Sequence, residues 1–376
     1  MAQTQDKPLQ ISIAVCARRW SQQIEILLES LREQKPTEEF ALREIFFVWN
    51  SEPSVISSSS KFLEAYLRDH WHPSLVDVNQ IGETRIGIPH ARNAALARAI
   101  EADDRFLAFV DDDCFVWPTW LTEMTSSVTR YQADVVAGGW RIAPAAIPSS
   151  WLPDYQFGPK HYQPFFTDAS SGEHLRHAYT RNVIFSIASV RGLPAEHQLF
   201  VEDLDGAGGS DVMFFHWLSH FGGKIVYAPE AVVTETYADD RLRLRWHFLR
   251  RIRTTQNRLI RRKMTMEPLG LVSGGLRTLL EIGWKIPIAL FGVGLTPFFP
   301  WFRSWIGEIV LKSAPYFAWF LLVVGIRYRE YLKGFSWIVR QSPVDEDASL
   351  KWQRPDSLQH ASETRPRFGA RPHRAD

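Results

Sequence analysis

The feature that most constrains this chain is an apolar run that ends in three consecutive aspartates. Residues 106–110 read Phe-Leu-Ala-Phe-Val, and Asp111, Asp112 and Asp113 follow at once. Such a run has the composition of a buried strand, and the charges indicate that it surfaces at its carboxyl end. Because ligands of open α/β sheets bind at that edge, we expect these carboxylates to line a cleft. They could hold a divalent cation against a phosphate, or they could form only a solvated acidic turn.

Strand and helix patterns alternate on both sides of this run. Short apolar runs predict strands at 11–17, 44–49, 74–80, 135–140, 182–186, 224–228 and 231–234. Apolar periodicity predicts helices at 21–34, 61–70, 88–100 and 212–221, and one that starts near Thr119 after Pro118. Residues 50–60, with their serine run, predict a polar loop, and 143–173 predict a long loop beside the substrate. The alternation is typical of the α/β class, with a parallel sheet wound by helices.

Composition excludes several classes of protein. The chain has 376 residues, a hydrophobic fraction of 45% and a formal net charge of +1, which argues against a general nucleic-acid-binding protein. Only Cys16 and Cys114 are present, so no disulfide framework is predicted and a reducing compartment fits. The first residues lack the pattern of a signal peptide, so we expect the catalytic part to stay in the cytosol.

The segment 241–263 is strongly basic and contains no acidic residue. A solvated helix face is the usual explanation of a charge run. Here, however, Trp246, Phe248 and Leu249 are interleaved with the arginines. This pattern favours an anionic partner, either a diphosphate or an anionic bilayer surface.

The chain changes character after residue 264. Two uncharged apolar runs, 286–302 and 313–326, are each shorter than the roughly 20 residues that a straight spanning helix needs. We predict that residues about 276–330 associate with membrane lipids at the cytoplasmic face, as a short spanning hairpin or as re-entrant or interfacial helices. A soluble helical hairpin is the alternative. Residues 341–376 are polar and are predicted to be disordered.

Six motifs, in order, make the chain similar to family 2 glycosyltransferases, and within them to bacterial enzymes that extend membrane-bound glycans for exopolysaccharide. They are ISIAVCARRW (11–20), IGIPHARNAA (86–95), VDDDCFVWPTWL (110–121), TRNVIF (180–185), GGSDVMFF (208–215) and APEAVVTETYADDRLRLRWHFLRRIR (228–253). The resemblance covers roughly residues 10–260. It implies a Rossmann-like GT-A domain with a mixed, mostly parallel sheet over 1–263. A nucleotide half (about 10–118) and an acceptor half (about 119–263) would be followed by a membrane-associated helical region, 264–340.

The resemblance also implies a reaction and its residues. A sugar would pass from a nucleotide-diphosphate sugar to a polyprenyl-diphosphate-linked saccharide, with inversion. Asp113, with Asp111, would hold Mg²⁺ or Mn²⁺, and Asp211 would be the general base. By local sequence alone Asp211 is a helix N-cap, and Glu202, Asp203 and Asp205 are rival carboxylates. The implied contacts to the nucleotide sugar are Ala17, Asn50, Glu52, Arg92, Asp111, Asp112, Asn182, Arg245 and Trp246.

Three positions depart from the family pattern. Asn50 and Glu52 occupy the loop where the family usually has an aspartate for the nucleotide base. Thr180-Arg181 replaces the glycine before Asn182, and Ser210 replaces the glutamate before Asp211. A non-catalytic, membrane-bound partner that binds a nucleotide or a glycan is therefore an alternative. A nucleotidyltransferase fits less well, because no glycine-rich phosphate loop with a lysine follows the first strand.

Overall fold

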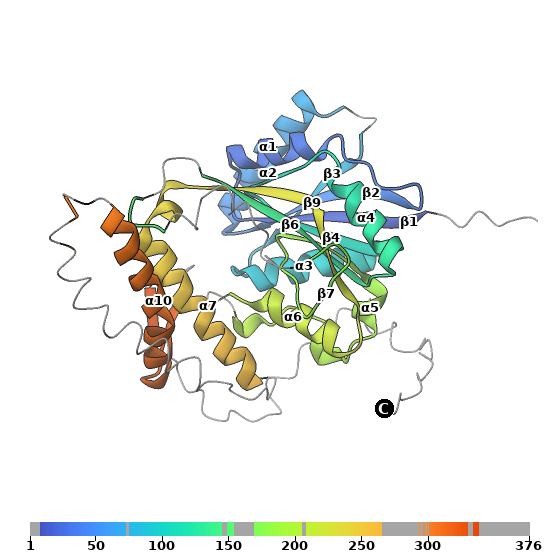
Figure 1. Cartoon of the computed structure of the whole chain (residues 1–376). Coiled ribbons are helices and arrows are strands. Elements are labelled where there is room, and N and C mark those ends of the chain that lie inside the picture. The colour runs from blue at the N-terminus through green and yellow to red at the C-terminus, as the bar shows by residue number, and fades with distance from the viewer. Residues whose placement is uncertain are drawn as a thin grey trace, which may run out of the picture.

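The protein is described by a computed structural model, in which a twisted central sheet carries helices on both faces (Figure 1). The structure describes residues 8–72, 75–144, 149–153, 169–204, 208–264, 293, 296–297, 299, 301–329 and 334–337. A pair of helices, α7 and α10, lies beside the sheet. The architecture confirms the predicted α/β class.

The sheet is mixed, with the strand order β3-β2-β1-β4-β8-β6-β9-β5, and β7 pairs with β9. Its strands are β1 Leu9–Ala17, β2 Phe40–Asn50, β3 Asp77–Glu83, β4 Phe106–Asp111, β5 Cys114–Val116, β6 Val135–Pro144, β7 His174–Leu175, β8 Asn182–Ser186 and β9 Ile225–Tyr237. The first four strands in the order are parallel, so their carboxyl ends meet at one edge. Strand β8 then runs antiparallel to both β4 and β6. The start of β8 therefore lies beside the end of β4.

Two apolar cores cover the two faces of the sheet. One face carries α1 Gln22–Leu31, α2 Pro53–His70 and α4 Trp120–Tyr131. The other carries α3 Ile88–Glu101, α5 Ile187–Arg191 and α6 Ser210–His220. The apolar periodicity of the sequence identifies the buried side chains of α1. Those of Ile24, Leu27, Leu28 and Leu31 all lie in the first core.

Three local predictions were wrong. The serine run is not a loop but part of α2, which begins at Pro53, a residue well suited to a first helical turn. Ser59 within it is buried and accepts a hydrogen bond from the Trp20 amide at 3.0 Å. The two short strands around Pro229 are one strand, β9, because a register shift at Gly138/Gly139 of the neighbouring β6 accommodates the irregularity. The short strand β5 was not predicted.

The C-terminal helices also differ from prediction. Helix α10 runs from Trp301 to Val323 without interruption, so the charged residues that precede the second apolar run lie in the same helix as most of that run. Glu308 and Lys312 pair with each other one turn apart, at 2.6 Å, which lets both lie within the helix. Ala314 and Ala318 pack against Ile252 of α7 Leu244–Met264. Two short strands, β10 Ile326–Arg329 and β11 Gly334–Trp337, follow as a hairpin.

Within the described part of the chain one helix, over Phe302–Val323, is long and apolar enough to cross a membrane, and about a third of its most apolar stretch is buried. Most of the first predicted apolar run, 286–302, and the predicted disordered tail, 341–376, lie outside the described residues.

Candidate active site

A cavity of about 760 Å³ opens at the carboxyl ends of the parallel strands. Its floor includes Ala17 at the end of β1, Asn50 at the end of β2 and Asp111 at the end of β4. The start of α3, the start of α6 and one side of α7 form its walls. The sheet therefore gathers strand ends that are far apart in the sequence, as expected for a doubly wound sheet.

The aspartate turn, Asp111–Asp113, lies in this cavity. Thr236 of β9 donates its amide to the Asp113 carbonyl at 3.1 Å, and β5 then pairs with β9. Burial, together with the repulsion of the neighbouring carboxylates, raises the pKa of Asp112 to about 8 and the pKa of Asp113 to about 7. Burial also raises the pKa of Asp111. The turn therefore favours protons or other cations close to its carboxylates.

A buried ion cluster adjoins the turn and was not predicted. Glu235 of β9 is 5% exposed and accepts hydrogen bonds from Arg181 Nη1 at 2.8 Å and Arg241 Nη1 at 2.5 Å. Trp140 Nε1 donates to the same carboxylate at 2.8 Å. The same Arg241 nitrogen lies 3.1 Å from Asp113 Oδ2. The sequence held one signal for this cluster, the acidic Glu235 within the apolar residues of β9. A buried carboxylate in a strand requires cationic partners nearby.

Asp211 also lines this cavity, from the first turn of α6. Gly209 is the N-cap of this helix, so the interpretation of Asp211 as a helix cap was wrong. Asp211 Oδ1 accepts the amide of Val212 at 2.8 Å, and Oδ2 lies 3.8 Å from Arg92 Nη2. Arg92 also donates to Ser210 Oγ at 2.9 Å. Arg92 therefore already has partners in Ser210 and Asp211, in addition to any phosphate that it could bind in the cavity.

Two glycines bring α7 close to Asp211. Gly208 and Gly209 have φ angles of +77° and +92°, which favour glycine. A Cβ on Gly208 would lie 3.1 Å from Arg253 Nη1, and one on Gly209 would lie 3.5 Å from Asn257 Nδ2. The basic helix thus packs directly against the loop that precedes Asp211.

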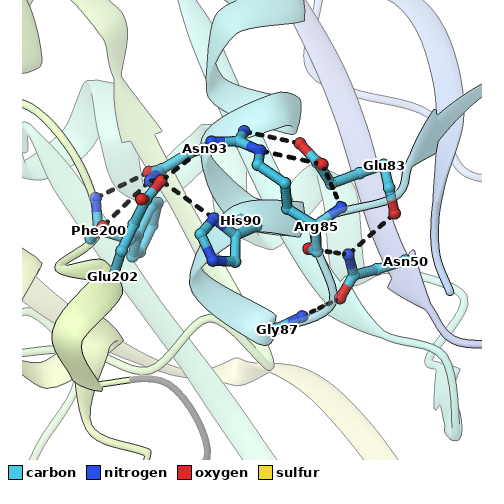
Figure 2. Close-up of polar contacts among 8 residues, drawn as sticks. All are labelled: Asn50, Glu83, Arg85, Gly87, His90, Asn93, Phe200 and Glu202. Atoms are coloured by element: carbon cyan, nitrogen blue, oxygen red, sulfur yellow. Dashed lines mark hydrogen bonds and ion pairs between the residues drawn. The ribbon is translucent and has the colours of Figure 1, made fainter. Parts of the chain in front are cut away.

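Two amides predicted to contact the donor instead hold the backbone. Asn50 donates to the carbonyls of Glu83 at 3.1 Å and Arg85 at 2.8 Å, and accepts the Gly87 amide at 2.7 Å (Figure 2). Asn182 accepts Trp120 Nε1 at 2.7 Å and donates to the carbonyls of Gly139 and Ala231. Asn50 still lines the cavity, whereas Asn182 is buried beneath it. Both donor hydrogens of each amide are used inside the protein.

Three other predicted contacts lie away from the cavity. Glu52 is exposed just before α2, and Arg245 is exposed on α7. Trp246 packs against Tyr237, with ring centroids 5.5 Å apart, and the Arg250 guanidinium lies 4.7 Å from the centre of the Trp246 ring. From the same helix Arg250, Arg253 and Arg258 reach the cavity lining instead. The basic run alone could not identify the inward-facing arginines, because that depends on how α7 is rotated against the sheet.

Glu202, a rival for the role of base, belongs to a separate network (Figure 2). It lies in a short 3-10 turn, η3 Glu202–Leu204, and pairs with His90 at 3.1 Å and Arg85 at 3.6 Å. Asn93 binds both its carboxylate and the backbone of Phe200. Glu202 is thus fixed against α3, outside the cavity lining. The side chains of the other two rivals, Asp203 and Asp205, lie outside the described residues.

The aspartate turn suits a divalent cation. Among the described residues no three metal-ligating side chains converge on one point. Asp111 and Asp113 nevertheless both line the cavity, and Asp113 already pairs with a cationic group. A Mg²⁺-like ion needs only one or two carboxylates when phosphate oxygens and waters supply its other ligands. The residues present therefore fit such an ion together with a diphosphate.

Comparison with known proteins agrees with this geometry. Residues 12–186 match the model of the family described as Glycosyl transferase family 2. The chain is 30% identical over 265 residues to the succinoglycan biosynthesis protein ExoM of Rhizobium meliloti (strain 1021), covering 69% of this chain and 77% of that protein. The chain belongs to glycosyltransferase family 2. This confirms the family inferred from the motifs, and with it the glycosyltransferase class and the GT-A type of α/β fold.

Solved structures include similar glycosyltransferases. The mannosyltransferase PcManGT from Pyrobaculum calidifontis, in complex with GDP-Man and Mn²⁺, has a TM-score of 0.49 and 16% identity over 85% of this chain and 88% of that one. S. aureus TarS 1-349 in complex with UDP-GlcNAc has a TM-score of 0.45 and 15% identity over 85% of this chain and 93% of that one.

Proposed function

We propose that this family 2 enzyme transfers a sugar, with inversion, from a nucleotide-diphosphate sugar to a polyprenyl-diphosphate-linked saccharide. The observation that carries the proposal is that the aspartate turn and Asp211 line one and the same cavity. The relative named for succinoglycan biosynthesis supports a role in exopolysaccharide assembly. The catalytic domain would comprise residues 1–263 and the membrane-associated region residues 264–340.

The donor occupies the end of the cavity formed by the strand termini. Asp113 and Asp111 would hold Mg²⁺ or Mn²⁺ against the diphosphate, and Asp112 supports their turn. When bound, such an ion neutralises charge on the leaving diphosphate as a Lewis acid. Ala17 borders the nucleotide, and Asn50 shapes the loop 83–87 on which the base rests rather than binding the base itself.

Asp211 accepts the proton of the acceptor hydroxyl. The hydroxyl oxygen forms a bond to the anomeric carbon with its electron pair. The bond from that carbon to the phosphate oxygen breaks, and its electron pair leaves with the diphosphate. Asp211 and the aspartate turn line the same cavity. In-line attack by the acceptor hydroxyl on the face opposite the leaving diphosphate would invert the anomeric carbon. Arg92, bonded to Ser210, holds the helix start that carries Asp211.

The C-terminal half of α10 supports attachment to a membrane. Phe317, Trp319, Phe320 and Val323 are each more than half exposed. Exposed aromatic and aliphatic side chains grouped on one helix are typical of a surface that enters a bilayer. The adjoining basic helix α7 complements anionic lipids. We propose that this region holds the cavity at the cytoplasmic face of the membrane, close to a lipid-linked acceptor.

Release of nucleoside diphosphate tests the proposal. Membranes carrying the wild type, Asp113→Ala or Asp211→Asn are incubated with UDP-, GDP- and TDP-sugars, with lipid-linked saccharide acceptors, and with or without Mn²⁺. Asp103→Asn is the matched control, because the Asp103 side chain is 88% exposed. We expect metal-dependent release from one donor that is lost in both site variants and kept in the control. No release from any donor would favour a non-catalytic nucleotide- or glycan-binding partner.

A further inference from the structure

Arg241 lies where it bridges two acidic side chains beside the donor end of the cavity. It belongs to η4 Asp239–Leu242, the short turn that directly follows β9. Its Nη1 contacts Glu235 Oε1 at 2.5 Å and Asp113 Oδ2 at 3.1 Å. The proposed metal ligand Asp113 is therefore paired with a cation that belongs to the protein itself.

We propose that Arg241 is a displaceable counter-ion of Asp113. On binding of metal and donor, Arg241 leaves Asp113, stays on Glu235 and donates hydrogen bonds to the diphosphate. Arg241 is thus a residue that couples metal binding to diphosphate binding. The inference rests on the proposed role of Asp113 as a metal ligand.

Distance shows that the arginine and a metal ion compete for Asp113. A Mg²⁺ ion binds a carboxylate oxygen at about 2.1 Å and keeps several waters around it. A guanidinium nitrogen already lies 3.1 Å from the same carboxylate. Two cations on one carboxylate would lie within a few ångströms of each other, where their repulsion is strong in a partly buried site. Metal binding therefore favours movement of the guanidinium away from Asp113.

Glu235 is held firmly enough to retain Arg241 after that movement. Its carboxylate also binds Trp140 Nε1 and Arg181, each at 2.8 Å. Arg181 in turn lies 4.4 Å from the centre of the Trp140 ring, which limits its own movement. The Arg241 guanidinium lies farther from its aromatic neighbour, 5.5 Å from the centre of the Tyr237 ring, and its side chain is 33% exposed compared with 14% for Arg181. An arginine has five N–H donors, so one carboxylate leaves several of them available to a phosphate.

The arrangement predicts positive coupling between metal and diphosphate. Metal alone must break the pair between Arg241 and Asp113 and gives the arginine no new anionic partner. Metal bound with a diphosphate supplies that partner within reach. By linkage, a diphosphate that favours the displaced arginine must raise metal affinity by the same factor. The departure from the family pattern at Thr180-Arg181 contributes here, because Arg181 helps to fix Glu235.

Binding measurements on the full chain test the proposal without turnover. Mn²⁺ binding is followed by electron paramagnetic resonance of the free ion, and binding of UDP and GDP is measured by equilibrium dialysis at saturating Mn²⁺. In Arg241→Gln we expect Mn²⁺ alone to bind about threefold more tightly, because an ion pair no longer competes. The nucleoside diphosphate should bind about tenfold more weakly, because a charge-assisted hydrogen bond is lost. Arg243→Gln is the matched control, because the Arg243 side chain is exposed. This variant should change neither affinity.

The two affinities are expected to change in opposite directions, which distinguishes this role of Arg241 from a purely structural one. If both affinities fall together in Arg241→Gln, or if neither changes while the wild type binds Mn²⁺ with UDP or GDP, the proposal is overturned. Arg241→Lys provides a second test if the glutamine variant does not fold. Lysine keeps the charge but has a shorter reach and fewer donors, so we expect both affinities to change in the same directions as in the glutamine variant, by smaller factors. If the wild type binds no Mn²⁺ with either nucleotide, the proposed role of Asp113 as a metal ligand is wrong, and the inference about Arg241 is rejected together with it.

Discussion

The cavity contains two acidic sites that differ in construction. At the aspartate turn three carboxylates are crowded together, and burial with mutual repulsion raises the pKa of two of them to about 8 and about 7. At the start of α6 a single carboxylate, Asp211, is 15% exposed and has one arginine partner at 3.8 Å. Crowded carboxylates favour a cation, whereas a single carboxylate beside open space can accept a proton. The difference supports the proposed division of roles, in which the turn stabilises the leaving group and Asp211 activates the acceptor.

The two sites also differ in what holds them. Strand pairing fixes the turn, since β4, β5, β8 and β9 meet there and Glu235 and Arg181 add ion pairs. The Asp211 site depends on two glycines and on contacts with α7. Substitutions at the turn should therefore alter stability and cation binding, while substitutions at α6 should alter chemistry with little effect on the fold.

The largest expected effect is on turnover at the α6 site. Asp211→Asn keeps the size of the side chain but removes the proton acceptor, so we expect sugar transfer to fall about 10³-fold. Binding of the donor nucleotide should change by less than about twofold, because the turn is untouched. Single-turnover transfer and equilibrium dialysis of the nucleotide measure the two quantities. An equal loss of sugar transfer and of nucleotide binding would show that Asp211 and the aspartate turn do not have the separate roles proposed here.

The second-largest expected effect is on the stability of the protein, through the buried Asn182 beneath the aspartate turn. Asn182→Ala leaves the Trp120 indole N–H and the carbonyls of Gly139 and Ala231 without their present partner. We expect the free energy of unfolding to fall by about 3 kcal/mol, measured by urea denaturation. Asn79→Ala, which removes one hydrogen bond to Glu44, is the smaller matched change. Similar losses in both variants would contradict the supporting role of Asn182.

The smallest expected effect is a pH dependence confined to the turn. Asp112 has a folded-state pKa of about 8, above its ordinary value of 3.8, so the folded protein holds the extra proton between these two pH values. Stability of the metal-free protein should therefore fall as pH rises through this range. Asp112→Asn removes the contribution of this carboxyl, so the melting temperature of the variant should exceed that of the wild type more at pH 8 than at pH 5. In Asp103→Asn, which keeps Asp112, the difference in melting temperature from the wild type should be the same at both pH values.

Metal provides a further check on that pH dependence. With Mn²⁺ and nucleoside diphosphate bound at the turn, the carboxylates gain a positive neighbour and the pH trend of the wild type should flatten. A trend that is the same with and without the metal complex would place the cation elsewhere.

Motifs in the sequence predicted most of the secondary structure and the two ends of the site. Asp111–Asp113 end a buried strand, and Asp211 lies in the first turn of a helix, as the patterns indicated. The patterns failed where a residue's partners are distant in the sequence. Asn50 and Asn182 occupy motif positions, yet their amides bind backbone groups, and Trp246 packs against Tyr237 rather than facing the cavity.

The sequence by itself determined the α/β class, the family and the strand end that carries the carboxylates, because local periodicity and motif order encode these features directly. Only the tertiary structure decided that Arg241, Glu235 and Arg181 meet Asp113, and that Arg250, Arg253 and Arg258 face the cavity while Arg245 does not. Charge is visible in a sequence, but its partners depend on strand order and on the rotation of helices. In this protein the antiparallel pairing of β5 with β9, and the η4 turn after β9, bring together residues more than a hundred positions apart.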